Sequence, residues 1–282
     1  MREEAIKKII EVFNVKQEEI INLNRFEKGM SNYTFSFEIN KDKYVIRLIG
    51  LAAEKYVDYN NELNVLNEAI KDNITSELIY FDALTGTKIS KFIEGVTNNN
   101  ITDIKLVKTL KKLHSIKSNK VNEYNLIDRL EKYQGYNNDS DLSDNYHLIK
   151  KWWLKNYTLN YEKQEKVLCH NDLQNINIIR NQEEVYLIDF EYASYNDIYY
   201  EFASYEGNKK ELFKLYYNRE ITKMEENHIR FYEIYQSLQW YQVALYKDKI
   251  GFSKLTNYNF KDLANYFIQN AYEIYEEIKG DY

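Results

Sequence analysis

Two short apolar segments of the chain each lead directly into a run of polar residues. Residues 167–169 (Val-Leu-Cys) precede the run from His170 to Asn177, and residues 185–188 (Val-Tyr-Leu-Ile) precede Asp189, Phe190 and Glu191. Apolar runs this short, bounded by polar residues, are typical of buried strands. We therefore expect a β hairpin over residues 178–188 that holds the two polar runs at a fixed spacing.

The two polar runs contain the side chains that phosphoryl transfer requires. Transfer from ATP needs an acceptor for the hydroxyl proton and hard oxygen ligands that hold Mg²⁺ across the phosphates. We expect Asp172 to orient and deprotonate the hydroxyl, and His170 to brace the loop. Asn177 and Asp189 are the expected Mg²⁺ ligands. The alternative is two chance polar turns in an Asn-rich chain, but two such runs that each follow a buried strand favour the site.

Composition sets limits on the class of protein. The 282 residues suffice for one large domain or two modest ones without disulfides, and Cys169 is the single cysteine. The net charge of −6 argues against a broad nucleic-acid surface. The first eight residues are too charged for a secretory signal, and no apolar run reaches membrane-spanning length. We expect a cytoplasmic protein with no nucleic-acid partner, no membrane insertion and no obligatory protein partner.

The first 95 residues show the pattern of a small sheet with one main helix. Apolar residues at helical spacing predict a lead-in helix over residues 3–13. Alternation of apolar and polar residues predicts a hairpin of residues 33–39 and 44–49. A strand at 20–26 and a turn at 29–32 precede this hairpin, and a helix at about 55–71 and strands at 78–81 and 87–92 follow it. This order is that of a nucleotide-binding kinase N-lobe.

The rest of the chain is mainly helical in pattern. We expect helices at about 104–113, 148–161, 224–247 and 260–278, and a surface loop at 137–144. The predicted fold class is α+β, with two lobes. Residues 1–93 would form an N-terminal nucleotide-binding lobe, and residues 94–282 a C-terminal catalytic and acceptor-binding lobe.

The motif H-x-D-x4-N at residues 170–177, followed by Ile-Asp-Phe-Glu-Tyr at 188–192, resembles the choline/ethanolamine kinase branch of the aminoglycoside-phosphotransferase-like kinases. Protein kinases carry Asp-Phe-Gly and a later Ala-Pro-Glu, which are absent here. The similarity runs from about Phe26 to Gly251, and bacterial choline kinases have the nearest pattern. The resemblance implies a bilobal protein-kinase-like fold, with an antiparallel sheet and one key helix in the N-lobe and a mostly helical C-lobe.

The resemblance also implies an activity. Members of this family use ATP and Mg²⁺ to phosphorylate the hydroxyl of a small amino alcohol, choline or ethanolamine. Asp172 would then be the catalytic base, and Asn177 and Asp189 the two metal ligands. An aminoglycoside or another small hydroxyl compound is the alternative acceptor. A non-catalytic pseudokinase is a further alternative, against which the retention of these three residues counts.

Further nucleotide-binding positions follow from the resemblance. Arg47 lies where these kinases place the Lys or Arg that holds the α- and β-phosphates, although it could be a solvated strand charge. Glu62 could pair with Arg47 or be an ordinary exposed glutamate, and Glu68 is its rival for the pairing. The turn at 29–32 resembles the phosphate-covering turn, and residues 91–95 fall at the hinge that meets adenine. The expected ATP-binding residues are Gly29, Ser31, Asn32, Arg47, Glu62, Lys91, Phe92 and Ile93.

The expected acceptor site is aromatic, because a quaternary ammonium is recognised by aromatic faces and a nearby carboxylate. Core packing is the alternative for each aromatic residue in a chain with 28 tyrosines. Bacterial choline kinases carry two tryptophans one turn apart on the corresponding helix. Trp240 matches the first, and Val243 stands at the second. Glu201 stands where the family usually has Asp. The candidates for acceptor binding are Glu191, Tyr192, Tyr195, Tyr235 and Trp240.

Overall fold

The computed structural model describes residues 1–26, 32–50, 52–97, 101–254, 256 and 258–282. The chain forms two compact units. The N-terminal unit contains residues 1–122 and 174–194, and the C-terminal unit contains residues 123–173 and 195–282. In this division residues 94–122 and 174–194 group with the first 93 residues. The expected boundary after residue 93, between a nucleotide-binding and a catalytic lobe, remains a prediction.

A five-stranded antiparallel sheet forms the centre of the N-terminal unit, in the order β1-β2-β3-β5-β4. The expected hairpin is present as β2 and β3, and the expected α+β class is confirmed. Helix α2 starts four residues later than predicted because the side chain of Asp58 caps it, accepting a hydrogen bond from Asn61 N–H at 3.1 Å. The elements of this unit are α1 (Arg2–Phe13), β1 (Ile21–Arg25), β2 (Asn32–Ile39), β3 (Asp42–Ile49), α2 (Tyr59–Lys71), β4 (Leu78–Phe81), β5 (Lys88–Lys91), α3 (Ile104–Ser115), β7 (Ile178–Arg180) and β8 (Val185–Leu187).

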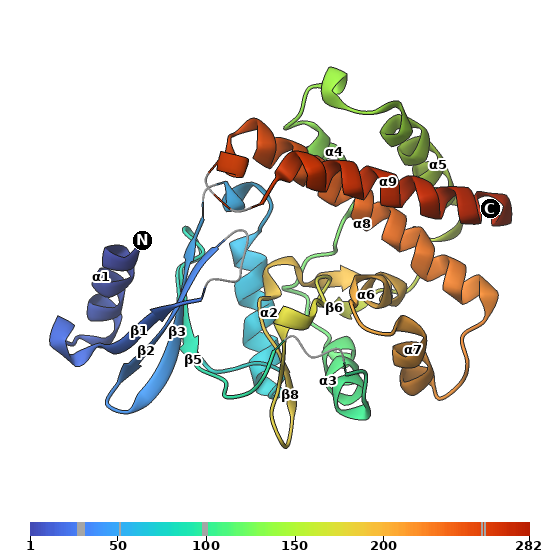
Figure 1. Ribbon diagram of the computed structural model, residues 1–282. Coiled ribbons are helices and arrows are strands. Elements are labelled where there is room, and N and C mark those ends of the chain that lie inside the picture. Colours follow the sequence, from blue (N-terminus) through green and yellow to red (C-terminus); the bar gives the residue numbers. More distant parts are fainter. Residues whose placement is uncertain (27–31, 51, 98–100, 255, 257) are drawn as a thin grey trace. The chain divides into compact units, whose positions relative to one another are not determined.

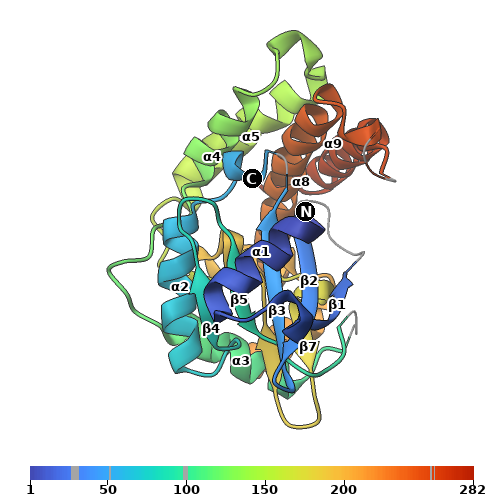
Figure 2. The same ribbon diagram turned by 90° about the vertical axis from the view of Figure 1, so that its left-hand side faces the viewer.

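One face of this sheet is covered by α1. Successive side chains of a strand point to opposite faces, so alternate residues of β2 and β3 meet the helix. Phe37 and Ile46 are fully buried there against Ala5 and Ile9. Figure 2 shows α1 lying in front of the sheet. This apolar face is the core of the N-terminal unit.

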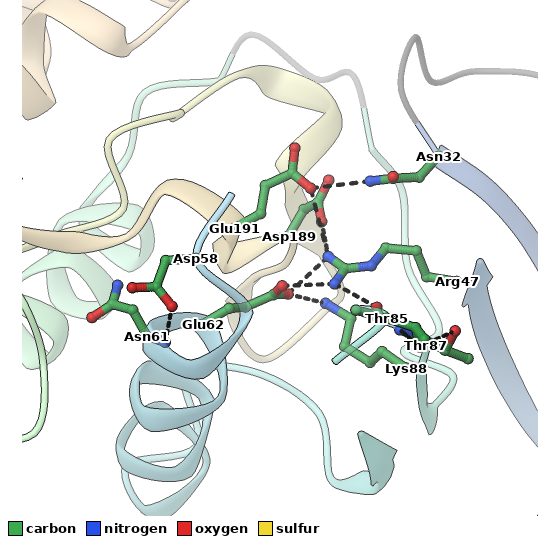
Figure 3. A network of polar contacts seen from close by, with 11 residues as sticks. Asn32, Arg47, Asp58, Asn61, Glu62, Thr85, Thr87, Lys88, Asp189 and Glu191 are labelled. Carbon is green, nitrogen blue, oxygen red and sulfur yellow. Dashed lines mark hydrogen bonds and ion pairs between the residues drawn. The ribbon is translucent and has the colours of Figure 1, made fainter. Parts of the chain in front are cut away.

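Arg47 of β3 points to the opposite face of the sheet, where it meets Glu62 of α2 (Figure 3). The guanidinium makes two hydrogen bonds to the carboxylate, Nη1 to Oε1 at 2.8 Å and Nη2 to Oε2 at 2.6 Å. Arg47 is 3% exposed and Glu62 is fully buried. Lys88 Nζ of β5 also contacts Glu62 Oε1, at 2.8 Å. Charges this deeply buried are tolerated only when paired, so these contacts fix α2 on the sheet.

The C-terminal unit is built from helices around α8. Figure 1 shows α8 and α9 side by side, and α5 also packs on both. The fully buried Trp153 of α5 stacks between Tyr157 and Phe231, with ring centroids 4.8 and 5.0 Å away. The elements are α4 (Leu126–Gln134), α5 (Asp144–Asn160), β6 (Val167–Cys169), β9 (Ser194–Asn196), α6 (Ile198–Ser204), α7 (Lys209–Tyr217), α8 (Lys223–Lys249) and α9 (Phe260–Ile278).

The expected loop at 137–144 is only partly a loop. It contains a short 3₁₀ turn at Asp139–Asp141, and α5 starts at Asp144 because the hydroxyl of Ser143 accepts a hydrogen bond from Tyr146 N–H. Helix α4 was not predicted from the sequence. Within the described residues, no helix has both the length and the apolar character needed to cross a membrane.

The buried ion pair makes stability depend on pH in the acid range. Burial opposes the ionisation of Glu62, but Arg47 and Lys88 outweigh it and lower the pKa of Glu62 from its ordinary 4.5 to about 2. We expect Glu62→Gln to cost about 3–5 kcal/mol at neutral pH, because two buried cations lose their charged partner. The difference from wild type should shrink as the pH falls from about 4.5 toward about 2, since the wild-type carboxylate is then protonated as well.

Urea unfolding across this pH range measures the effect. Glu68→Gln is the matched control on the same helix, because Glu68 pairs with the exposed Lys71. It should cost less than about 1 kcal/mol. A Glu62→Gln loss that stays constant with pH would contradict the assigned role of the ion pair.

Candidate active site

The loop that carries Asp172 is held by a buried carboxylate of its own unit. Glu201 of α6 is fully buried, and its two oxygens accept hydrogen bonds from the backbone N–H groups of His170 at 2.9 Å and Asn171 at 2.8 Å. Asn171 has a left-handed backbone with φ 64°, and its side-chain oxygen accepts a hydrogen bond from Asn196 Nδ2 at 2.9 Å. These contacts fix the backbone on the N-terminal side of Asp172. His170 is also fully buried within this loop.

The C-terminal side of the same loop is fixed by α6 as well. The N–H of Leu173 donates to Ser204 Oγ at 3.2 Å, and that hydroxyl donates to the carbonyl of Glu201 at 2.9 Å. Helix α6 therefore holds the residues on both sides of Asp172. In the sequence Glu201 stands out only as a departure from the family pattern, because nothing in its spacing shows which backbone groups it meets.

Asn177 and Asp189 lie at the base of the hairpin formed by β7 and β8 in the N-terminal unit. Asn177 ends a 3₁₀ turn (Asn175–Asn177), and its carbonyl accepts a hydrogen bond from the N–H of Ile188 at 2.9 Å. Ile188 directly precedes Asp189, so this bond ties the two polar residues together across the hairpin. Asp189 has a left-handed backbone with φ 65° and ψ 60°, which turns the chain away from the strand.

Asp189 belongs to a cluster of charged side chains around the buried Arg47 (Figure 3). Arg47 Nη1 donates to Asp189 Oδ1 at 3.0 Å and lies 3.7 Å from Glu191 Oε2. Asn32 Nδ2 donates to Glu191 Oε2 at 3.0 Å. Burial and the neighbouring Asp189 carboxylate raise the pKa of Glu191 to about 8, despite the attraction of Arg47. The carboxyl groups of Glu62, Asp189 and Glu191 thus all lie close to the guanidinium of Arg47.

This cluster has polar atoms left for a ligand. Within the described ranges, the buried Nε of Arg47 and Oδ1 of Asn32 have no hydrogen-bond partner. The side chain of Asp189 is 36% exposed, so its carboxylate can be reached from solvent. Carboxylate and amide oxygens are suitable ligands for Mg²⁺, which usually takes one or two protein ligands together with phosphate oxygens and water. The donor atoms of Asp189 and Asn177 therefore fit this ion.

The other expected nucleotide-binding residues lie at several places in the N-terminal unit. Gly29 and Ser31 fall outside the described residues. Lys91 ends β5, where it forms an exposed ion pair with Glu77. The N–H of Phe92 donates to the carbonyl of Lys43 at 2.9 Å and so continues the sheet pairing toward Ile93. The adenine contact expected at residues 91–93 remains a prediction.

A pocket of about 280 Å³ opens between four helices of the C-terminal unit. Trp240 of α8 lines it together with Tyr266 and Phe267 of α9. Its wall from α6 is Ala203, the residue before Ser204, which holds the Asp172 loop. The remaining lining residues are Lys209, Glu233, Gln236, Ser237, Asn270 and Ile274. The pocket therefore adjoins the helix end on which the loop rests.

Of the aromatic residues expected at the acceptor site, Trp240 alone lines this pocket. Tyr235 is fully buried and its hydroxyl donates to the carbonyl of Leu126 at 2.8 Å, so it belongs to the core of the unit. Tyr195 lies on β9, where its carbonyl accepts a hydrogen bond from the N–H of Tyr124. Tyr192 and Glu191 lie in the 3₁₀ turn after Asp189, in the N-terminal unit.

Sequence reasoning missed the aromatic residues of α9. Tyr266 and Phe267 lie in a helix with a regular amphipathic pattern, and such a pattern does not separate a pocket wall from an ordinary surface. Val243, which stands where bacterial choline kinases have a second tryptophan, is buried and does not line the pocket. The other aromatic residues that line the pocket, Tyr266 and Phe267, come from α9.

Comparisons with known proteins agree with the motif. The family model for choline/ethanolamine kinase matches residues 23–242. The "Uncharacterized protein MG356 homolog" of Mycoplasma pneumoniae is 30% identical over 205 residues, which cover 71% of this chain and 70% of that protein.

Two solved structures share the protein-kinase-like fold. Choline kinase LicA from Streptococcus pneumoniae superimposes with a TM-score of 0.79 at 21% identity, covering 98% of this chain and 99% of that chain. LicA is also known in complex with AMP. A Plasmodium vivax ethanolamine kinase gives a TM-score of 0.76 at 17% identity, covering 95% and 86%. The family model matches most of the chain, and this match shows that the chain belongs to the choline/ethanolamine kinase family.

Proposed function

We propose that this protein transfers the γ-phosphoryl group of Mg-ATP to the hydroxyl of a small amino alcohol, choline or ethanolamine. The observation that carries this proposal is the aromatic pocket beside the helix end that holds the Asp172 loop. A base and a pocket for an ammonium group in one unit are what an amino-alcohol kinase requires. Membership of the choline/ethanolamine kinase family supports the same reaction class.

Each expected residue then has a chemical role. Asp172 accepts the proton of the acceptor hydroxyl while that oxygen bonds to the γ-phosphorus, and ADP leaves as the bond to its bridging oxygen breaks. The bonds from Glu201 and Ser204 hold Asp172 in place for this transfer. Asn177 and Asp189 would hold Mg²⁺, which neutralises phosphate charge when bound. Arg47 would donate hydrogen bonds to the α- and β-phosphates.

The pocket wall suits an ammonium group. A cation within about 6 Å of an aromatic face is stabilised by about 0.5–2 kcal/mol, and Trp is the best such partner. Trp240 and Tyr266 would provide these faces. Glu233 is the carboxylate of the pocket, but it forms an ion pair with Lys209. Recognition of the cation therefore depends mainly on the aromatic side chains, which suits the trimethylammonium group of choline.

Two amides of the pocket favour ethanolamine as the second candidate. Gln236 donates its amide nitrogen to the carbonyl of Tyr200, and Asn270 donates its own to Ser237 Oγ at 2.9 Å. Their nitrogens are therefore engaged, and their amide oxygens are the atoms that can face a ligand. A primary ammonium can donate hydrogen bonds to such oxygens, whereas a quaternary one cannot.

The size of the pocket argues against an aminoglycoside. A volume of about 280 Å³ lies at the lower end of the roughly 300–1,000 Å³ found for drug-sized ligands. A kinetic panel of choline, ethanolamine and several aminoglycosides with Mg-ATP, followed by identification of the phosphorylated product, tests the proposal. Phosphorylation of an aminoglycoside in preference to both amino alcohols would refute it.

We expect Asp172→Ala to reduce kcat by at least about 10²-fold, since general-base catalysis typically contributes about 10²–10⁴-fold. Binding of Mg-ADP should be nearly unchanged, because Asp172 acts on the acceptor hydroxyl. Steady-state kinetics and Mg-ADP titration measure these effects. An Asp172→Ala enzyme with near-normal kcat would remove this residue from the catalytic role.

Asp189→Ala should weaken Mg-dependent nucleotide binding as well as turnover, because a metal ligand is lost. Steady-state kinetics and Mg-ADP titration measure both effects.

Trp240→Ala should raise KM for the amino alcohol by about 2- to 30-fold, the range that about 0.5–2 kcal/mol of cation–π energy gives. KM for ATP should change little. Trp152→Ala is the matched control, because Trp152 packs against Phe231, Tyr275 and Tyr282 rather than lining the pocket. The control should lower the melting temperature without changing either KM. A Trp240 variant that behaves in the same way would place Trp240 in the packing of α8 and α9 alone.

A further inference from the structure

Lys88 is a second buried cation beside Glu62 that the family motif did not single out. It lies on β5 directly opposite Arg47 of β3, so both side chains point to the same face of the sheet. Its side chain is 12% exposed, and Nζ lies 2.8 Å from Glu62 Oε1. Figure 3 shows the ammonium and the guanidinium converging on one carboxylate. Glu62 is thus held by two independent cations.

The two terminal nitrogens of Arg47 have all four of their N–H donors engaged. They donate to Glu62 twice, to Asp189 at 3.0 Å and to the carbonyl of Gly86 at 3.0 Å. Nucleotide phosphates that need more than the remaining Nε donor would compete for these four N–H groups. Any donor that leaves Glu62 for a phosphate weakens the pairing of a fully buried carboxylate, and an unpaired buried carboxylate is strongly unfavourable.

The turn that leads into β5 places Lys88 firmly. Asp82 accepts hydrogen bonds from Leu84 N–H at 2.9 Å and from Thr85 Oγ1 at 2.8 Å. Gly86 has a φ of 71°, and a Cβ atom there would lie 2.5 Å from the ring of Tyr59 in α2. The turn therefore packs tightly on α2, and Lys88, two residues beyond Gly86, is held at a fixed distance from Glu62.

We propose that Lys88 is a positioning residue for nucleotide binding. Lys88 keeps the carboxylate of Glu62 paired and keeps α2 packed on the sheet. The guanidinium of Arg47 can then donate hydrogen bonds to the nucleotide phosphates without leaving Glu62 unpaired. The inference rests on the proposed function, in which Arg47 contacts those phosphates. Lys88 acts through Glu62 and does not itself contact the nucleotide.

The test compares Lys88→Met and Lys88→Arg with wild type. Lys88→Met should weaken Mg-ADP binding and raise KM for ATP by about tenfold, which corresponds to about 1.4 kcal/mol. KM for the amino alcohol should stay unchanged. Lys88→Arg should restore nucleotide binding because it restores the cation. Equilibrium titration well below the melting temperature of each variant measures binding by the folded protein.

Lys71→Met is the control, because it removes an exposed lysine that pairs with Glu68 on the same helix. It should bind Mg-ADP like wild type. A Lys88→Met protein that loses thermal stability but binds Mg-ADP like this control would overturn the inference, because the role of Lys88 would then be structural only.

A double-mutant cycle separates positioning from direct contact with phosphate. In a Glu62→Gln background, Lys88→Met should change the Mg-ADP affinity by less than about twofold, because its target is already gone. A further loss near tenfold would show direct phosphate contact and overturn the inference. Glu62→Asp, which keeps the charge but shortens the side chain, replaces Glu62→Gln in the cycle if the latter does not fold.

The wild-type protein distinguishes failure of this inference from failure of the proposed function. A wild type that neither binds Mg-ADP nor consumes ATP would overturn both. A wild type that binds Mg-ADP and phosphorylates an amino alcohol, together with a Lys88→Met variant of equal affinity, would overturn the role of Lys88 alone.

Discussion

The N-terminal unit depends on one buried guanidinium. Arg47 joins β3 to α2 through Glu62, to the turn before β5 through the carbonyl of Gly86, and to the hairpin end through Asp189. Because Arg47 and Glu62 are withdrawn from water, each needs the other, and the loss of one leaves an uncompensated charge. The sheet, the helix and the expected metal ligand are therefore coupled energetically, and nucleotide binding would redistribute the donors of a single side chain.

The C-terminal unit holds its loop with a different kind of interaction. Glu201 is as deeply buried as Glu62, but its described partners are the backbone N–H groups of His170 and Asn171 rather than cations. Peptide dipoles stabilise a buried carboxylate without bringing another side-chain charge to the loop. Because these N–H groups belong to the loop backbone, hydrogen bonds to them hold the backbone itself. This arrangement fixes the chain on one side of Asp172 while Ser204 fixes it on the other.

The pocket of the C-terminal unit combines aromatic residues from two helices. Trp240 of α8 lines it together with Tyr266 and Phe267 of α9. The two helices pack along each other, so a side chain from either can form the same wall. Glu233 of the pocket is paired with Lys209. In the proposed function, a bound cation would therefore meet mainly the aromatic faces.

The sequence by itself determined the motif and the order of elements in the N-terminal unit. The β2–β3 hairpin, α9 and the polar runs that follow β6 and β8 are local, because alternation and helical spacing act over a few residues. The pairing of Arg47 with Glu62 could be suggested because the family pattern links these two positions. The tertiary structure alone decided the contacts of Lys88, Glu201 and Tyr266. Their partners lie on other elements, 26 residues away for Lys88 and Glu62, and the position of a side chain relative to a distant element depends on strand register and helix packing. No local pattern contains that information, since an amphipathic helix or a charged strand residue has the same sequence whether it faces solvent, a pocket or a buried carboxylate.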